Sequence, residues 1–221
     1  MLFRSNRALG DRLHHAVDAA TWRAASTLLL TAPMTPLLFM GQEWAASTPF
    51  AFFTDFSPAL GDAVVAGRRR EFAAFPEFAG AAAERIPSPQ ADATFTASQL
   101  RWDERDHGPF ARSLALNRRL LSLRAAHPSL QASDRTTCDA EAIGDEALAF
   151  VRHADGDHAH LIVVRLRGQG AVAAPALRQR AWIKALDTED ADFADDPQPP
   201  TIDAAAGRID FRRPGALIFR T

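Results

Sequence analysis

The sequence contains a single cysteine, Cys138, a single lysine, Lys184, and no tyrosine. One cysteine excludes an intrachain disulfide and indicates a reducing compartment. An excess of charge is also missing, since the formal net charge is −2. This balance gives no reason to expect a nucleic acid or an anionic membrane surface as a partner.

Long hydrophobic runs are absent as well. The most apolar window, residues 28–40, is interrupted by Pro33 and Pro36 and is too short to cross a bilayer. Residues 1–15 carry charge throughout and hold no apolar core of signal-peptide length. We therefore expect a cytoplasmic protein. Its 221 residues are enough for one large domain or two modest ones.

The most informative segment that is present covers residues 36–44, PLLFMGQEW. Apolar residues without alternation are typical of a strand buried on both faces of a parallel sheet, so residues 37–40 are predicted to form one. Gly41 ends this strand, and Gln42, Glu43 and Trp44 follow at once. Side chains in that position, at the carboxyl end of a parallel barrel strand, are where active sites are built.

Helical patterns flank this strand. Asp18 is a predicted N-cap for a helix over residues 18–30 that Pro33 ends. Gly108-Pro109 opens a second helix over residues 110–125, and a short helix is expected over residues 63–72. A helix followed by a buried strand is the repeating unit of α/β barrels, so residues 1–130 are predicted to be the α/β part of the chain.

After residue 130 the apolar period changes from about 3.6 to about 2 residues, which predicts strands. Two of them flank Asp155-Gly156, a hairpin signal. The predicted strands cover residues 148–153, 158–167, 181–186, 208–211 and 216–220. We expect a small antiparallel β-sandwich over residues 131–221. The overall class is α/β plus all-β.

Several of these segments resemble one known family. Residues 35–50 (TPLLFMGQEWAASTPF), 52–55 (FFTD), 67–72 (GRRREF) and 214–216 (PGA) resemble malto-oligosyltrehalose trehalohydrolase, a glycoside hydrolase family of the α-amylase superfamily. The resemblance runs from Asn6 onward and covers only the carboxyl-terminal part of the family's length. It implies the last helix–strand–helix portion of a (β/α)₈ barrel over residues 1–130, followed by a C-terminal β domain.

The resemblance also implies a reaction, the retaining hydrolysis of the α-1,4 bond next to the trehalose end of malto-oligosyl trehalose. Such chemistry needs two carboxyl groups about 5–5.5 Å apart, and in this superfamily both lie upstream of Met1. A third acidic residue belongs to a segment whose end matches residues 6–12, which puts its position on Leu2. We therefore expect no catalytic residue here and no activity of this chain alone, and we expect a truncated or frame-shifted reading or a misplaced start codon.

The resemblance assigns substrate binding to Gln42, Glu43, Trp44 and Arg7. Glu43 either lines the sugar pocket, which its position favours, or caps the loop. For Trp44, stacking on a sugar ring and packing against the barrel rim are equally plausible. Arg7 either orders its own loop or contacts substrate. The expected partner is a malto-oligosaccharide-type substrate in a complemented enzyme, together with self-association through the unpaired strand at 37–40.

Two other functions remain open, a non-catalytic carbohydrate-binding or accessory protein and a fragment of another superfamily member such as a branching enzyme. We expect no cofactor and no metal. The histidines and aspartates of residues 153–160 are attributed to a hairpin, because a metal site needs a tighter geometry. The acidic run at residues 187–196 is predicted to be a solvated loop, since it lacks calcium-loop spacing.

Overall fold

The computed structural model describes residues 7–154 and 158–221, and these form two compact units. The helix–sheet unit consists of Val17–Ala45 and Glu104–Thr221. The loop-rich unit consists of the described residues up to Ala16 and of Ala46–Asp103. Each unit has its own hydrophobic core.

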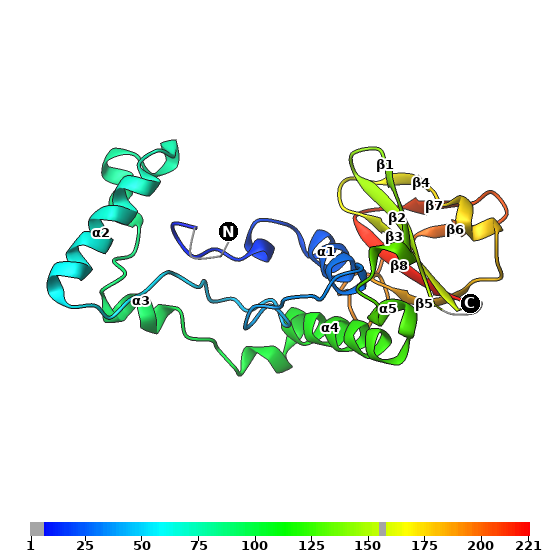
Figure 1. Ribbon diagram of the computed structural model, residues 1–221, viewed down its shortest axis with the longest axis horizontal. Helices are drawn as coiled ribbons and strands as arrows, with labels where there is room; N and C mark the ends of the chain where they lie inside the picture. Colours follow the sequence, from blue (N-terminus) through cyan, green and yellow to red (C-terminus); the bar gives the residue numbers. More distant parts are fainter. Residues whose placement is uncertain (1–6, 155–157) are drawn as a thin grey trace. The chain divides into compact units, whose positions relative to one another are not determined.

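Two antiparallel sheets form the β part of the helix–sheet unit (Figure 1). The larger sheet runs in the order β1 (Cys138–Ile143), β2 (Ala147–His153), β3 (Ala159–Arg165), β8 (Gly215–Arg220) and β5 (Ile183–Asp187). The smaller sheet has the order β4 (Gly170–Ala173), β7 (Arg208–Phe211) and β6 (Thr201–Asp203). The predicted antiparallel β domain is therefore confirmed. β2 and β3 pair as a hairpin, while its turn at Asp155-Gly156 lies outside the described residues.

The central strands of the larger sheet are apolar on both faces because both faces are covered. Phe150, Ile162 and Ile218 lie side by side across β2, β3 and β8 and point into the core beneath the helices. Their neighbours Leu161 and Phe219 point to the opposite face, into the core shared with the smaller sheet. Alternate residues therefore serve two cores, and every residue of β3 is buried.

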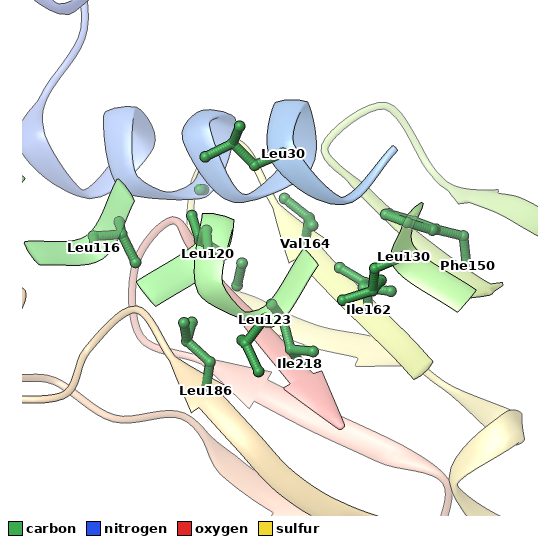
Figure 2. Packing of buried hydrophobic residues seen from close by; sticks show 12 residues of the cluster. Leu30, Leu116, Leu120, Leu123, Leu130, Phe150, Ile162, Val164, Leu186 and Ile218 are labelled. Carbon is green, nitrogen blue, oxygen red and sulfur yellow. The ribbon is translucent and has the colours of Figure 1, made fainter. Parts of the chain in front are cut away.

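Helices α1 (Ala19–Thr31), α4 (Gly108–Ala126) and α5 (Pro128–Gln131) cover the outer face of the larger sheet. Figure 2 shows their leucines directed at the strands, and the fully buried ones are Leu30, Leu116, Leu120 and Leu130. The leucines of α4 recur at helical spacing, and this spacing places one apolar face on the sheet. The predicted helices at 18–30 and 110–125 thus form, and both belong to the same unit as the β domain.

Side chains fix both ends of α1. At the start, Asp18 Oδ1 accepts a hydrogen bond of 2.6 Å from the Thr21 N–H, as predicted for an N-cap. At the end, Arg124 Nη1 from α4 donates to the Leu30 carbonyl at 2.9 Å. Arg152 Nη1 from β2 donates to the Thr31 carbonyl at 2.6 Å. The carbonyls that a helix terminus leaves unpaired are thus satisfied by arginines from two neighbouring elements.

The acidic run at residues 187–196 is only in part the predicted solvated loop, since Asp190, Asp192, Asp195 and Asp196 are exposed but its start is buried. Glu189 is only 3% exposed, and its carboxylate binds Arg23 of α1 and Arg213 of the β7–β8 turn, each at 2.5 Å. Asp187 and Thr188 are also buried. The sequence pattern misled because the neutralising arginines lie far away along the chain, so the charges looked unpaired.

The loop-rich unit has little regular structure, and prolines interrupt it repeatedly. Its helices are α2 (Pro58–Phe72), α3 (Asp92–Ala97) and the 3₁₀ turns η2 (Leu13–His15), η3 (Pro76–Phe78) and η4 (Gly80–Arg85). Gly10 lies against the backbone of Phe50, at a φ of +72°, and accepts a hydrogen bond from its N–H at 2.8 Å. A Cβ at Gly10 would come within 2.4 Å of that backbone, so this approach requires glycine.

The strand predicted at residues 37–40 is wrong for the described chain. This segment is extended without ladder partners, and Leu37 is 79% exposed. An apolar run forms a strand only where neighbouring strands supply hydrogen bonds, and none does here. The 3₁₀ turns η5 (Glu104–Asp106), η6 (Arg135–Thr137) and η7 (Pro175–Arg178) complete the helix–sheet unit. The division of the chain at residue 130 stays a prediction.

His160 supplies a pH-dependent term in stability. It is 3% exposed on β3, and its Nδ1 lies 2.8 Å from the hydroxyl of Ser129. Burial, followed by His127, Arg220 and Arg152, lowers the pKa of His160 from 6.5 to about 4. Between these values the unfolded chain binds a proton that the folded chain does not, so stability is greatest above pH 6.5 and is lost as the pH falls.

The free energy of unfolding should therefore fall between pH 6.5 and about 4, by up to about 1.4 kcal/mol per pH unit. His160→Gln keeps a hydrogen-bonding side chain next to Ser129 and should remove this component. Urea denaturation across the pH range measures it, with exposed His107→Gln as the matched control. Equal pH dependence in wild type and His160→Gln would contradict the assignment.

Candidate functional site

The loop at residues 39–45 turns sharply at the end of the apolar extended segment. The Gln42 N–H donates to the Phe39 carbonyl at 2.8 Å, and the Ala45 N–H donates to the Gln42 carbonyl at 3.2 Å. Gly41 has a φ of +80° and Ala45 a φ of +57°, so both adopt the left-handed region. Glycine suits this conformation, whereas for alanine it carries strain, which surrounding contacts must hold in place.

Gln42 is directed into the loop itself. Its side chain is buried, and Oε1 accepts a hydrogen bond of 3.3 Å from the Phe39 N–H. Gln42 therefore binds both backbone groups of Phe39, the N–H through its side chain and the carbonyl through its own backbone N–H. These two hydrogen bonds fix the position of the next residue, Glu43.

Glu43 is half-buried, and its backbone and its side chain have different surroundings. Its carbonyl accepts a hydrogen bond of 2.9 Å from the Asn117 side-chain amide on α4. Its carboxylate oxygen Oε2 is buried, and no donor in the described part of the chain reaches it. A buried carboxylate oxygen normally has a donor, so this oxygen is suited to accept a hydrogen bond from a ligand.

Trp44 is buried, at 4% exposure, and its indole Nε1 donates to Glu104 Oε1 at 3.1 Å. Trp44 and Glu104 both belong to the helix–sheet unit. The hydrogen bond also links the loop to the turn η5, directly before α4. Trp44 therefore anchors the loop on its carboxyl-terminal side.

Arg7 is exposed and belongs to the loop-rich unit, whereas Gln42, Glu43 and Trp44 belong to the helix–sheet unit. Within that unit its carbonyl accepts a hydrogen bond of 3.2 Å from the Gly10 N–H. Arg12, at the end of the same segment, is 1% exposed and donates from Nε to the Thr48 carbonyl at 2.6 Å. The position assigned to the third acidic residue, Leu2, lies outside the described residues.

Sequence reasoning missed two residues that shape the site, Asn117 and Glu104. Asn117 is 2% exposed, and its amide also donates to the Ser113 carbonyl at 2.9 Å. A polar residue on the leucine-rich face of α4 was the available signal, because such a residue needs a buried partner. Glu104 lies in the turn η5, and no sequence signal connected it with Trp44.

Two further observations concern ligands and membranes. Across residues 7–154 and 158–221, no group of three or more His, Cys, Asp or Glu side chains could hold a metal ion. His153 instead lies 2.8 Å from Asp139, whereas His160 contacts Ser129. In the same residues, no helix has the length and hydrophobicity required to cross a membrane.

Comparison with known proteins places these residues in context. A malto-oligosyltrehalose trehalohydrolase from Deinococcus radiodurans is 52% identical over 132 residues, which cover 59% of this chain and 21% of the relative. The enzyme of the same name from Saccharolobus solfataricus is 37% identical over 102 residues, which cover 46% of this chain and 16% of the relative. The chain matches about a fifth of the length of such relatives. No family model matches it.

Solved structures give a consistent result for the fold. A Salmonella typhimurium protein assigned as an α-amylase superposes on 98% of this chain and 33% of its own, with a TM-score of 0.76 and 27% identity. The α-amylase from H. orenii matches 92% of this chain and 36% of its own, with a TM-score of 0.52 and 14% identity, which concerns the fold alone. The resemblance to trehalohydrolases of the α-amylase superfamily is therefore confirmed.

The role of Asn117 in holding the loop can be tested. Asn117→Leu should lower the free energy of unfolding by about 1–3 kcal/mol, because the Glu43 carbonyl loses its donor. Hydrogen–deuterium exchange at the Ala45 amide should become faster. Gln131→Leu is the control, since that amide also donates to a helix carbonyl but is exposed. Unchanged exchange at Ala45 in Asn117→Leu would show that the loop is held by other contacts.

Proposed function

We propose that this chain is part of a retaining glycoside hydrolase of the α-amylase superfamily that releases trehalose from malto-oligosyl trehalose. The observation that carries this proposal is the similarity to curated trehalohydrolases from bacteria and an archaeon. Since the match covers about a fifth of those relatives, the catalytic activity belongs to a longer assembly of which this chain supplies one portion. A cytoplasmic location is part of the same proposal.

Residues 1–130 then supply the last helix–strand–helix portion of the barrel. The extended segment before the loop supports this, because the backbones of Leu37 and Leu38 make no hydrogen bond to any described residue. Leu37 and Met40 are 79% and 52% exposed, which suits apolar side chains that pack against other strands. Supplied with neighbours, this segment becomes the buried strand that its sequence predicts.

Gln42, Glu43, Trp44 and Arg7 are proposed to serve the substrate side of the barrel. Glu43 is assigned the most direct role, since its Oε2 can accept a hydrogen bond from a sugar hydroxyl. Gln42 and Trp44 position this carboxylate from either side of the turn. Retaining hydrolysis itself needs two carboxyl groups about 5–5.5 Å apart, and the resemblance places both outside this chain.

A second candidate function is non-catalytic carbohydrate binding by the β domain. It is favoured by a groove of about 300 Å³ on the edge of the sandwich, next to the half-buried ring of Trp182. The indole Nε1 donates to the Ala176 carbonyl at 2.8 Å, which fixes the ring at the groove. Glu141 and Gln179 line the same groove and offer groups that bind sugar hydroxyls.

The trehalohydrolase proposal predicts that the chain alone does not hydrolyse malto-oligosyl trehalose. A chimera in which it replaces the matching part of the Deinococcus radiodurans relative should be active. In the chimera, Glu43→Gln should lower kcat/KM at least about tenfold, or 1.4 kcal/mol, and exposed Glu84→Gln should not. An inactive but folded chimera, or turnover by the chain alone that Glu43→Gln abolishes, would overturn the proposal.

Self-association of the isolated chain is a separate expectation. Met34, Leu37 and Met40 are all more than half exposed, and such side chains associate with each other when no partner covers them. Size-exclusion chromatography should show species larger than a monomer, and Leu37→Ser with Met40→Ser should shift them toward the monomer. Leu60→Ser, at an exposed leucine of the loop-rich unit, should not. A monomeric wild type would contradict this expectation.

A further inference from the structure

A cationic pocket opens where the last turns of α4 meet the edge strand β5 and the end of β8. Its volume is about 320 Å³, near the lower limit for pockets that hold small metabolites. Its basic lining residues are Arg119 and His127 from α4 and its C-cap, Lys184 from β5 and Arg220 from β8. Ser122 adds a hydroxyl, and among the residues that the structure describes no aspartate or glutamate lines the pocket.

The charges of this pocket are only partly compensated. Lys184 lies 3.4 Å from Asp187 and 3.9 Å from Asp190, which are set outside the lining. Arg119 donates from Nη2 to the Ala185 carbonyl at 3.2 Å, a contact that orients its guanidinium but does not neutralise it. The guanidinium of Arg220, whose backbone belongs to β8, makes no hydrogen bond or ion pair to any residue in the described ranges.

Other arginines of the helix–sheet unit have carboxylate partners, unlike the two arginines of this pocket. Arg23, Arg112, Arg165 and Arg213 are each paired with a carboxylate at 2.5–2.7 Å. Two arginines and a lysine that converge on one pocket, with no carboxylate among its described lining residues, repel one another. An anion in the pocket would remove that repulsion.

We propose that this pocket binds a phosphate dianion, either free or as the monoester of a small metabolite. Arg220 presents a planar fork that matches two phosphate oxygens, and Arg119 presents a second one. Lys184 contributes a point charge, and Ser122 donates a hydrogen bond. The pocket exceeds what one phosphate group fills, so a small attached group can enter with it. This inference does not depend on the proposed glycosidase activity.

His127 reports on occupancy of the pocket. Burial, followed by Arg220, Arg119 and His158, lowers its pKa below 6.5 in the unliganded chain. The other groups nearby are Lys184 across the pocket and the His160 ring, whose centroid is 4.6 Å away. A bound dianion favours the protonated imidazole, so phosphate should raise the pKa of His127.

The test is calorimetric titration of the full chain with inorganic phosphate, glucose 6-phosphate and glucose, at constant ionic strength. Saturable binding is expected for the first two and none for glucose, and the tighter of the two identifies the free or the esterified form. Arg220→Gln and Arg119→Gln should each weaken binding at least about tenfold. Arg118→Gln, on the exposed side of the same helix, should leave the affinity unchanged.

NMR of the histidine side chains adds a second readout. Phosphate should raise the pKa of His127 in wild type and in Arg118→Gln, and much less in Arg220→Gln. The thermal melting of each variant shows whether it is folded. The proposal is overturned if chloride at the same ionic strength moves His127 equally, if phosphate does not saturate, or if folded Arg220→Gln and Arg119→Gln bind as wild type does.

Discussion

The carboxylate of Glu189 joins the helix layer of the helix–sheet unit to its strands. Arg23 approaches it from α1 and Arg213 from the β7–β8 turn, while the Gln198 N–H donates to Oε2 at 3.0 Å. A buried charge is tolerated only when it is neutralised and hydrogen-bonded, and removing one partner typically costs about 3–5 kcal/mol. The packing of α1 on the sheet and the course of the acidic loop therefore depend on the same side chain.

Arginines play this connecting role at several places because their forked guanidinium reaches more than one acceptor. Arg124 contacts the carbonyls of Leu30, Ala32 and Met34, and Arg152 contacts those of Thr31 and Ala132. These carbonyls lie at or just beyond the ends of α1 and α5, where the helix supplies no N–H partner. The core of leucines gives the unit its stability, whereas the arginines determine where each helix ends on the sheet.

The sequence predicted what local pattern controls. The cap at Asp18, the apolar face of α4 and the strands β2, β7 and β8 all follow from local sequence pattern. β1, β4 and β6 were missed because they are short or mostly exposed, so no run of large apolar residues marks them. At the candidate site the sequence pointed to the loop residues but not to their supports, because Glu104 lies 60 residues from Trp44 and Asn117 lies 74 residues from Glu43. The strand at 37–40 was predicted from apolar residues with which no strand in the described part of the chain pairs.

Helix α4 holds the chain on both sides of that extended segment. Arg124 binds the Met34 carbonyl at 2.8 Å before it, and Asn117 binds the Glu43 carbonyl at 2.9 Å after it. The segment between them is therefore tied to the same helix at both ends, although no described strand pairs with it. Fixing a backbone residue costs about 1–2 kcal/mol in conformational entropy. Strands added to this segment would meet a chain whose ends are already held, so less ordering opposes their association.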